Sequence, residues 1–241
     1  NIIFHYNMTA SPSILLHSSV EGTNGDQEIS NLKLDGNNLT AWSAIMINAR
    51  SNVSIHDLTV VNFRTYGVVY NGGVSYLTAP PKIYAKGNSF YNNTVLNCSI
   101  YENGNGEGAL KIGGQEGMTI YNNRLIQTQR EEGINGYLIK FYSNGYNKGL
   151  KIYNNYIEKA PYDGFTWPIC MELWYSQGGI EIYSNEIIGC LDLANSYKGN
   201  YDYSIFVHDN IIGPEAMRPR MEIGIAFEGE TQGSIVSNNY I

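Results

Sequence analysis

The chain contains few charged residues and few residues that interrupt regular structure. Only 15% of its 241 residues are charged, and it has 7 prolines and 3 cysteines. No stretch rich in proline, serine or charge divides the chain into two parts. We therefore expect a single domain that spans residues 1–241.

Long basic runs and long apolar runs are absent as well. There are 15 Lys and Arg against 22 Asp and Glu, which gives a net charge of −7, and the most basic cluster is RPR at 218–220. Nucleic-acid binding depends on neutralising phosphates, so we expect no nucleic-acid partner. Apolar runs such as ILL at 14–16 are far shorter than the roughly 20 residues that cross a bilayer. A soluble protein without membrane insertion is predicted.

Two further features bear on location and redox state. The chain begins at Asn1 without a signal peptide, so a mature or trimmed chain is expected. Spacing within the repeat described below keeps Cys98 and Cys190 too far apart to pair and makes a Cys170–Cys190 bond unfavourable, so buried free thiols are predicted.

Asn-x-Ser/Thr sequons fit an exported protein at the cell surface or outside the cell. They occur at Asn7, Asn38, Asn52, Asn92 and Asn97.

Asparagine, glycine and tyrosine are abundant instead, and they recur in a repeat. The chain reads MTIYNNRLIQ, LKIYNNYIEK, IEIYSNEIIG and finally SIVSNNYI. One Asn position recurs at intervals of 30, 32, 30, 25 and 29 residues, which is typical of a solenoid. The residues at this position are Asn93, Asn123, Asn155, Asn185, Asn210 and Asn239.

The hydrophobic pattern around this Asn predicts strands. Apolar residues lie three positions before it and two after it, which indicates a strand, a turn and a second strand. A third strand signal precedes each repeat, in ALKI at 109–112, YLIKF at 137–141, CMELW at 170–174 and IGIAF at 223–227. Three short strands per repeat, without helical periodicity, predict an all-β parallel β-helix of seven to eight coils, roughly 35 Å long.

With these motifs the chain resembles the right-handed parallel β-helix proteins of the pectate-lyase-like superfamily, over nearly its whole length. The resemblance implies that the repeated Asn forms an internal ladder at the turn between the strands PB2 and PB3. By the same alignment Asn37 and Asn7 take this position in earlier coils, whereas Leu58 replaces it in another. Relatives usually cap the first coil with a helix, but this chain opens with NIIFHYN. Either it is a fragment of a longer chain, or its uncapped ends meet other subunits.

The resemblance also implies that the strand PB1 and the preceding T3 loop line a substrate cleft. Alternation along PB1 points Lys111, Lys140 and Glu172 outward in one file. We predict Lys140 as a base at a sugar C5 and Glu172 as acid, base or metal ligand. The predicted substrate-binding residues are Lys111, Tyr142, Trp174, Arg218, Arg220 and Glu228. The alternative is that these are solvated residues of an ordinary sheet face, with Lys140 and Glu172 pairing between coils.

Acidic residues also occur in the segments assigned to T3 loops. Glu131 and Glu132 lie in QREEG, Asp163 in PYDGF and Asp192 in CLDLAN. We predict that two of them, with Asp163 and Glu132 as the catalytic candidates, converge as a hydrolase pair or as a Ca²⁺ site. The alternative is that they are turn residues before a strand.

The PB2 strands carry a regular outward column of tyrosines. Tyr91, Tyr121, Tyr153 and Tyr183 belong to it, between His56 and His208. The column predicts a stacked aromatic ladder that stiffens the sheet, with a docking strip for sugars or a neighbouring molecule as the alternative.

Two function classes follow. The first is an exported polysaccharide lyase or glycoside hydrolase that acts on an acidic polysaccharide in the groove of PB1 and T3. The second is a non-catalytic surface fibre, adhesin or tailspike-like module that self-associates through its ends and tyrosine strip. The chain lacks the Arg-x-Pro-x-x-Arg pattern of pectate lyases and the Asn-Thr-Asp, Asp-Asp, Gly-His-Gly and Arg-Ile-Lys pattern of polygalacturonases. No named catalytic signature is therefore carried over, and the elaborated T3 loops favour the enzyme.

Overall fold

The structure is a computed structural model that describes residues 2–3, 8–39, 41–74, 80–100, 108–129, 131, 133–142, 145–160, 168–195, 204–213 and 223–241. Asp163, Glu132, Arg218 and Arg220 lie outside these residues. Across the described part the chain forms strands and no helix, so no helix there could cross a membrane.

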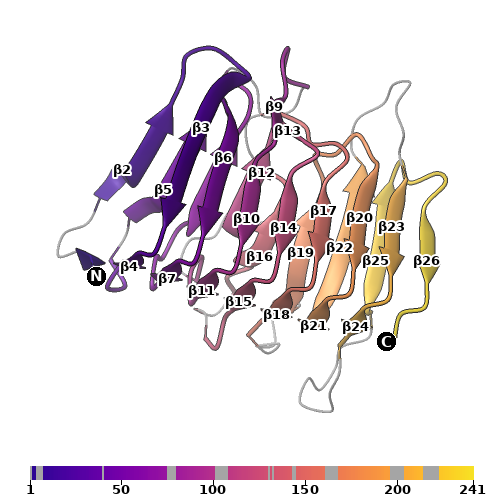
Figure 1. Ribbon diagram of the computed structural model, residues 1–241. Coiled ribbons are helices and arrows are strands. Elements are labelled where there is room, and N and C mark those ends of the chain that lie inside the picture. Colours follow the sequence, from indigo (N-terminus) through magenta and orange to yellow (C-terminus); the bar gives the residue numbers. More distant parts are fainter. Residues whose placement is uncertain are drawn as a thin grey trace.

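The described chain is a parallel β-helix (Figure 1). Its strands run side by side from the N-terminal to the C-terminal end in three parallel sheets, each with eight strands among the described residues. Each strand inside a sheet pairs with the equivalent strand of the coils before and after it. The predicted fold class, including the buried Asn ladder, is thereby confirmed.

The sheets keep the names PB1, PB2 and PB3. PB1 holds β2 (Met8–His17), β5 (Ala41–Asn48), β8 (Val68–Asn71), β12 (Gly108–Gly113), β16 (Tyr137–Lys140), β19 (Ile169–Leu173), β22 (Cys190–Asn195) and β25 (Ile225–Gly229). PB2 holds β3 (Thr23–Ser30), β6 (Arg50–His56), β10 (Ser89–Tyr91), β14 (Thr119–Tyr121), β17 (Lys151–Tyr153), β20 (Ile180–Tyr183), β23 (Ile205–His208) and β26 (Ile235–Ser237). PB3 holds β1 (Ile2–Ile3), β4 (Lys33–Asp35), β7 (Thr59–Val61), β11 (Thr94–Leu96), β15 (Arg124–Ile126), β18 (Tyr156–Glu158), β21 (Glu186–Ile188) and β24 (Ile211–Ile212). A small sheet pairs β9 (Ala85–Lys86) with β13 (Gln115–Glu116).

The IYNN motif shows how four residues build each PB2 to PB3 corner. Ile152 is buried in the core and Tyr153 points outward. Asn154 is exposed and turns the chain at a φ of 55°, a left-handed conformation that Asn tolerates better than most residues. Asn155 then points inward and is 2% exposed.

The buried asparagines form a continuous hydrogen-bonded ladder. Asn155 Oδ1 accepts from the backbone N and from Nδ2 of Asn123, and Asn155 Nδ2 donates to Asn185 Oδ1 and Ile120 O. The amide suits this place because it supplies donors and acceptors that satisfy buried backbone groups. The same pattern joins Asn93, Asn123, Asn155, Asn185, Asn210 and Asn239.

The ladder is shorter at its N-terminal end than the alignment predicted. Leu58 takes the ladder position, as expected, and its backbone N donates to Asn93 Oδ1. In the preceding coil the register places Leu32 there, because β4 and β7 pair as Lys33 with Thr59. The prediction for Asn37 is therefore wrong: Asn37 is exposed, and its backbone N donates to the Asp35 carboxylate. Asn7 lies outside the described residues.

One coil connects PB3 to PB1 through a single residue, Gly189. Its φ is +143°, and a Cβ there would lie 2.5 Å from Pro168 O and 2.6 Å from Cys170 Sγ, so only glycine fits. The chain consequently enters β22 directly. The assignment of CLDLAN to a T3 loop is wrong, because these six residues are a PB1 strand.

The tyrosine column is a stacked ladder capped by histidines. Neighbouring rings from His56 to His208 have centroids 4.6–5.2 Å apart and are 4–9° from parallel. The faces of the inner rings lie against one another, so their edges rather than their faces meet the solvent. This geometry fits the structural role and provides no ring faces for sugars to stack on.

The three cysteines are free and buried, as predicted. Burial raises the pKa of Cys98 to about 12 and that of Cys190 to about 11. Both thiols therefore stay protonated and behave as core side chains.

Candidate functional site

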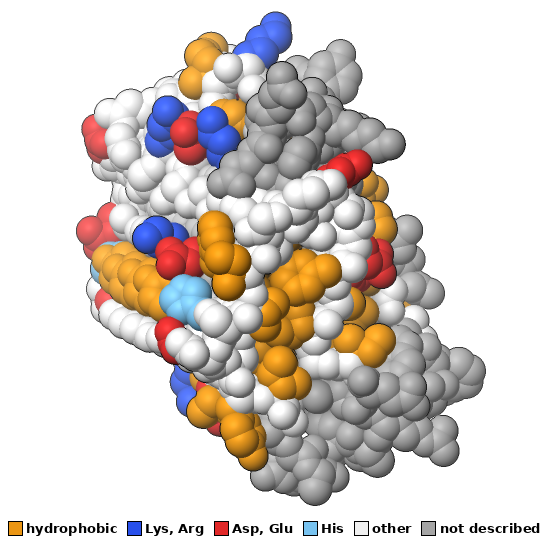
Figure 2. Space-filling view, turned by 90° about the vertical axis from the view of Figure 1, so that its right-hand side faces the viewer, with side chains coloured by type: hydrophobic (Ala, Val, Ile, Leu, Met, Phe, Trp, Pro, Cys, Tyr) orange, Lys and Arg blue, Asp and Glu red, His pale blue; other side chains and the backbone are white. Residues whose placement is uncertain are grey.

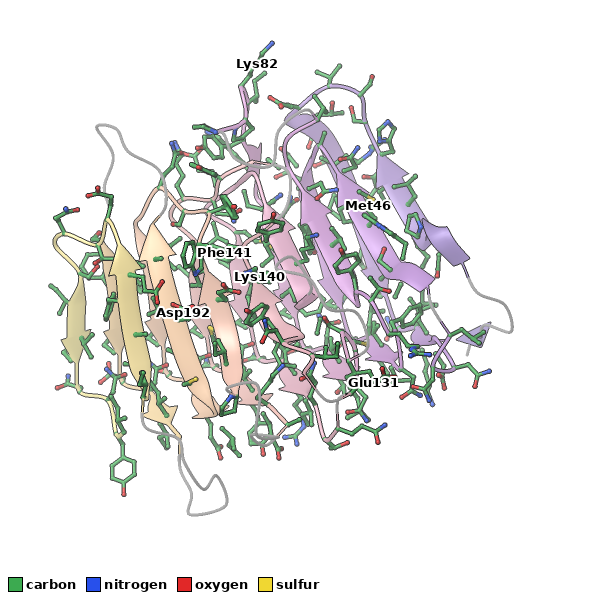
Figure 3. All side chains as sticks on the ribbon, turned by 180° about the vertical axis from the view of Figure 1, so that it is seen from behind. Met46, Lys82, Glu131, Lys140, Phe141 and Asp192 are labelled. Carbon is green, nitrogen blue, oxygen red and sulfur yellow. The ribbon has the colours of Figure 1, made fainter. Side chains whose placement is uncertain are left out.

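A file of charged side chains runs along the outer face of PB1. The register pairs Lys111 with Lys140, Lys140 with Glu172, and Glu172 with Asp192. The predicted file of Lys111, Lys140 and Glu172 is therefore present, and Asp192 extends it. Figure 3 shows Met46, Lys140 and Asp192 on this one sheet, from β5, β16 and β22.

A bulge in β19 brings the two carboxylates onto the same face. Ile169 pairs with Cys190 and Met171 with Leu191, so Cys170 is one residue in excess. If the register set by Ile169 and Cys190 continued through Cys170 without the bulge, Glu172 would oppose Leu193, which points into the core. Bulges commonly redirect side chains next to functional sites, and here the bulge sets Glu172 beside Asp192.

Lys140 and Glu172 form a buried ion pair between coils. Lys140 Nζ donates to Glu172 Oε2, and the two side chains are 2% and 12% exposed. The Lys140 ammonium also lies 4.5 Å from the centroid of the Tyr137 ring and 5.5 Å from that of Tyr142. The alternative that Lys140 and Glu172 pair between coils is thus correct for the pairing itself. Its premise that the two residues are solvated is wrong. Removing one partner of such a pair typically costs about 3–5 kcal/mol.

Glu172 and Asp192 differ in their surroundings. Burial raises the pKa of Glu172, Asp192 adds to this increase, and Lys140 and a hydrogen bond from Tyr137 oppose it. Trp174 Nε1 donates to Asp192 Oδ2 at 3.4 Å, while the buried Asp192 Oδ1 has no hydrogen-bond partner among the described residues. Glu172 therefore holds its proton to higher pH than an ordinary glutamate, and Asp192 Oδ1 keeps an acceptor position available.

Aromatic side chains surround the pair. A pocket of about 340 Å³ is lined by Lys140, Tyr142, Glu172, Trp174 and Tyr175. The rings of Tyr142 and Tyr175 meet edge to face at 4.9 Å. A polar floor with aromatic walls is the usual composition of a small-molecule or sugar site.

The remaining predicted residues lie on both sides of this pocket. Lys111 is half-buried one strand beyond Lys140, with its ammonium 4.4 Å from the Tyr66 ring centroid. Glu228, on β25, is exposed and lines a second hollow of about 170 Å³ together with Asp192. Lys111, Tyr142, Trp174 and Glu228 therefore lie along the face that carries Lys140 and Glu172.

The acids predicted to converge do not all meet. Glu131 pairs with Arg64 at 2.8 Å, and Figure 3 shows it at the lower edge of the molecule, away from Asp192 on the face of PB1. Among the described residues no group of three His, Cys, Asp or Glu side chains could hold a metal ion, so the part of the Ca²⁺ hypothesis that joins Glu131 to Asp192 is not supported. Glu132, Asp163, Arg218 and Arg220 lie outside the described residues, and their predicted roles stay predictions.

Sequence reasoning missed Asp192 as the neighbour of Glu172. The alternation of Leu191, Asp192 and Leu193 was available as a strand signal, with both leucines buried and the aspartate outward. Tyr137 and Tyr175 were missed as well. They contact the site from positions outside the outward file of PB1. The alternation of side chains along a strand does not predict such contacts.

Fold and site together define a parallel β-helix in which two partly buried carboxylates, Glu172 and Asp192, are cross-strand neighbours on PB1, with Glu172 in an aromatic pocket. No protein-family model, no curated protein and no solved structure matches the chain.

Proposed function

We propose that the protein is an exported carbohydrate-active enzyme, a glycoside hydrolase that cleaves an acidic polysaccharide along PB1. The observation that carries this proposal is the cross-strand pairing of Glu172, which lines the aromatic pocket, with Asp192, which accepts a hydrogen bond from the pocket residue Trp174. The resemblance to pectate-lyase-like proteins agrees with a polysaccharide substrate but supplies no catalytic residues.

Paired carboxylates suit hydrolysis with retention of configuration. Strands pair at about 4.8 Å, close to the separation of roughly 5–5.5 Å between the two carboxyl groups of retaining glycosidases. Protonated Glu172 donates its proton to the glycosidic oxygen while Asp192 attacks the anomeric carbon, and the leaving sugar departs as an alcohol. Glu172, now a carboxylate, takes a proton from water, which attacks the same carbon and releases Asp192.

The Lys140 ion pair favours this chemistry over β-elimination. A lyase needs a base with a free lone pair at the sugar C5, but the Lys140 ammonium is bound to Glu172. In the hydrolase Lys140 fixes the position of Glu172 and stabilises its carboxylate after proton donation. Tyr142 and Trp174 offer rings for sugar faces, and Lys111 offers a charge for a uronate carboxylate.

The test is turnover of pectate, alginate and glycosaminoglycan by the wild type and three variants. Glu172→Gln and Asp192→Asn should each lower kcat/KM by at least about 100-fold. Glu181→Gln removes the carboxylate of a matched Lys–Glu pair on PB2, Lys151–Glu181 at 3.1 Å, and should leave turnover unchanged. Products should carry a new reducing end with retained configuration; an unsaturated product, or full activity of both site variants, would contradict the hydrolase.

A structural or adhesive module is the second candidate, and one observation favours it. Figure 2 shows apolar side chains gathered on the face at the C-terminal end of the described stack, where Ile235, Val236 and Ile241 are 54%, 46% and 65% exposed. Exposed apolar patches are typical of interaction surfaces. Filaments in light scattering, without turnover of any polysaccharide, would favour this candidate over the enzyme.

A further inference from the structure

Aromatic rings and ammonium groups continue along PB1 from the carboxylate pair towards the N-terminal end. The Tyr142 ring centroid lies 5.5 Å from the Lys140 ammonium and 5.6 Å from that of Lys111. Lys111 also lies 4.4 Å from the Tyr66 ring, and Tyr66 meets Trp42 edge to face at 5.4 Å. Trp42, Tyr66, Lys111 and Tyr142 thus form one connected row, which we call the remote stripe.

The remote stripe extends well beyond the pocket. Trp42 lies on β5 and Lys111 on β12, and the sheet order from β5 to β19 is β5, β8, β12, β16, β19. Four steps of about 4.8 Å separate the rung of Trp42 from the rung of Glu172 by roughly 19 Å. All four stripe side chains are partly exposed, so they present contact surface along this length.

We propose that the remote stripe binds further sugar units of the same polysaccharide chain. These units lie between the cleaved bond and the N-terminal end of the β-helix. The proposal rests on the proposed function, because it places the cleaved bond at Glu172 and Asp192. Rings at Trp42, Tyr66 and Tyr142 pack against the CH-rich faces of sugars, and Lys111 among them binds a uronate carboxylate. A long chain fills the stripe and the pocket together, whereas a short one fills the pocket alone. The enzyme therefore prefers long chains.

The experiment measures binding and turnover against chain length. Oligosaccharides of the best acidic polymer, from dimers to octamers, are titrated calorimetrically into the Glu172→Gln protein. Affinity should rise by more than tenfold from the trimer to the longest oligomers. Added to Glu172→Gln, Trp42→Ala and Lys111→Met should each weaken binding of long oligomers about tenfold and leave the trimer unchanged. Tyr153→Ala, which removes a partly exposed ring from PB2, is the matched control. It should change neither the affinity for long oligomers nor the affinity for the trimer.

The outcomes separate this inference from the proposed function. If the wild type cleaves the polymer but affinity does not depend on length, or the stripe variants weaken trimer and octamer equally, the remote stripe is overturned while the hydrolase stands. If neither polymer nor oligomer is bound or cleaved, both proposals fall. Should Trp42→Ala not fold, Lys111→Met tests the same stripe, because it removes the charge and keeps the length of the side chain.

Discussion

Glu172 and Asp192 are direct cross-strand neighbours on β19 and β22, held on one face by the bulge at Cys170. Two carboxylates in this relationship repel each other, and burial penalises the charge of Glu172 further. Lys140 and Tyr137 compensate only in part. A carboxyl with a raised pKa beside a second carboxylate is the arrangement from which we propose Glu172 as the general acid and Asp192 as the nucleophile.

The pKa of Glu172 should respond to its neighbours in opposite directions. Asp192→Asn removes a negative charge and should lower the pKa of Glu172, whereas Lys140→Met removes a positive charge and should raise it. NMR titration of ¹³C-labelled glutamate carboxyls measures both shifts without any substrate. Glu228→Gln, on the exposed part of β25, is the control. A Glu172 pKa unchanged in Asp192→Asn would show that the two carboxylates are not coupled.

The same raised pKa should set the pH dependence of the proposed hydrolase activity. The folded pKa of Glu172 lies above its unfolded value, so the folded protein keeps this proton to higher pH. General-acid activity should be present below the folded pKa and decline as pH rises through it. The alkaline limb of kcat/KM should therefore coincide with the NMR titration of Glu172. A limb that differs from this titration would assign the acid to another residue.

Loss of a central ladder amide should destabilise the protein strongly. Asn155→Ala leaves the Asn123 backbone N, the Asn123 Nδ2 and Ile120 O without a partner that Asn155 now supplies. At about 1–3 kcal/mol for each unsatisfied buried group, the free energy of unfolding should fall by about 3 kcal/mol or more. Urea unfolding followed by circular dichroism measures the change. Asn154→Gly, at the adjacent exposed turn with a φ of 55°, should have a much smaller effect; equal losses would contradict the ladder's role.

His208 should make stability depend on pH. Its hydrogen bond to Asp209 and its contact with Glu181 raise the pKa of His208, against a smaller opposing effect of burial. The folded pKa lies above the unfolded value of about 6.5, so the stabilisation is fully present below that value and is lost as pH rises through the folded pKa. The unfolding temperatures of the wild type and of His208→Gln should therefore differ most in mild acid and become equal at alkaline pH. His17→Gln removes a histidine from PB1 as a control; an unchanged difference across this range would exclude the mechanism.

The repeat itself was sufficient to predict the fold. Ile152, Tyr153 and Asn155 alternate between core and solvent, and this alternation identifies a strand, a turn and the buried ladder position from local chemistry alone. Lys111, Lys140 and Glu172 could be placed in one file for the same reason, because side-chain direction on a strand follows a period of two. The first ladder positions were less predictable. Leu58 was placed correctly, but Leu32 rather than Asn37 occupies the preceding position, because an apolar side chain there leaves no Asn motif to align.

The site depended on features that no single repeat contains. Asp192 became the neighbour of Glu172 because Gly189 makes a one-residue turn into β22 and Cys170 forms a bulge in β19. The turn and the bulge each shift the register between neighbouring coils. Each therefore changes which side chains are cross-strand neighbours.

The sequence by itself determined the parallel β-helix, its ladder of asparagines and tyrosines, and the outward file on PB1, because these follow from periodicity within each coil. Only the tertiary structure decided that Lys140 is buried against Glu172, that Asp192 lies beside them, and that Trp42 and Tyr66 extend the same face. The physical reason is that burial and pairing between coils depend on which rungs are stacked together and in what register, and residues from separate repeats meet only there.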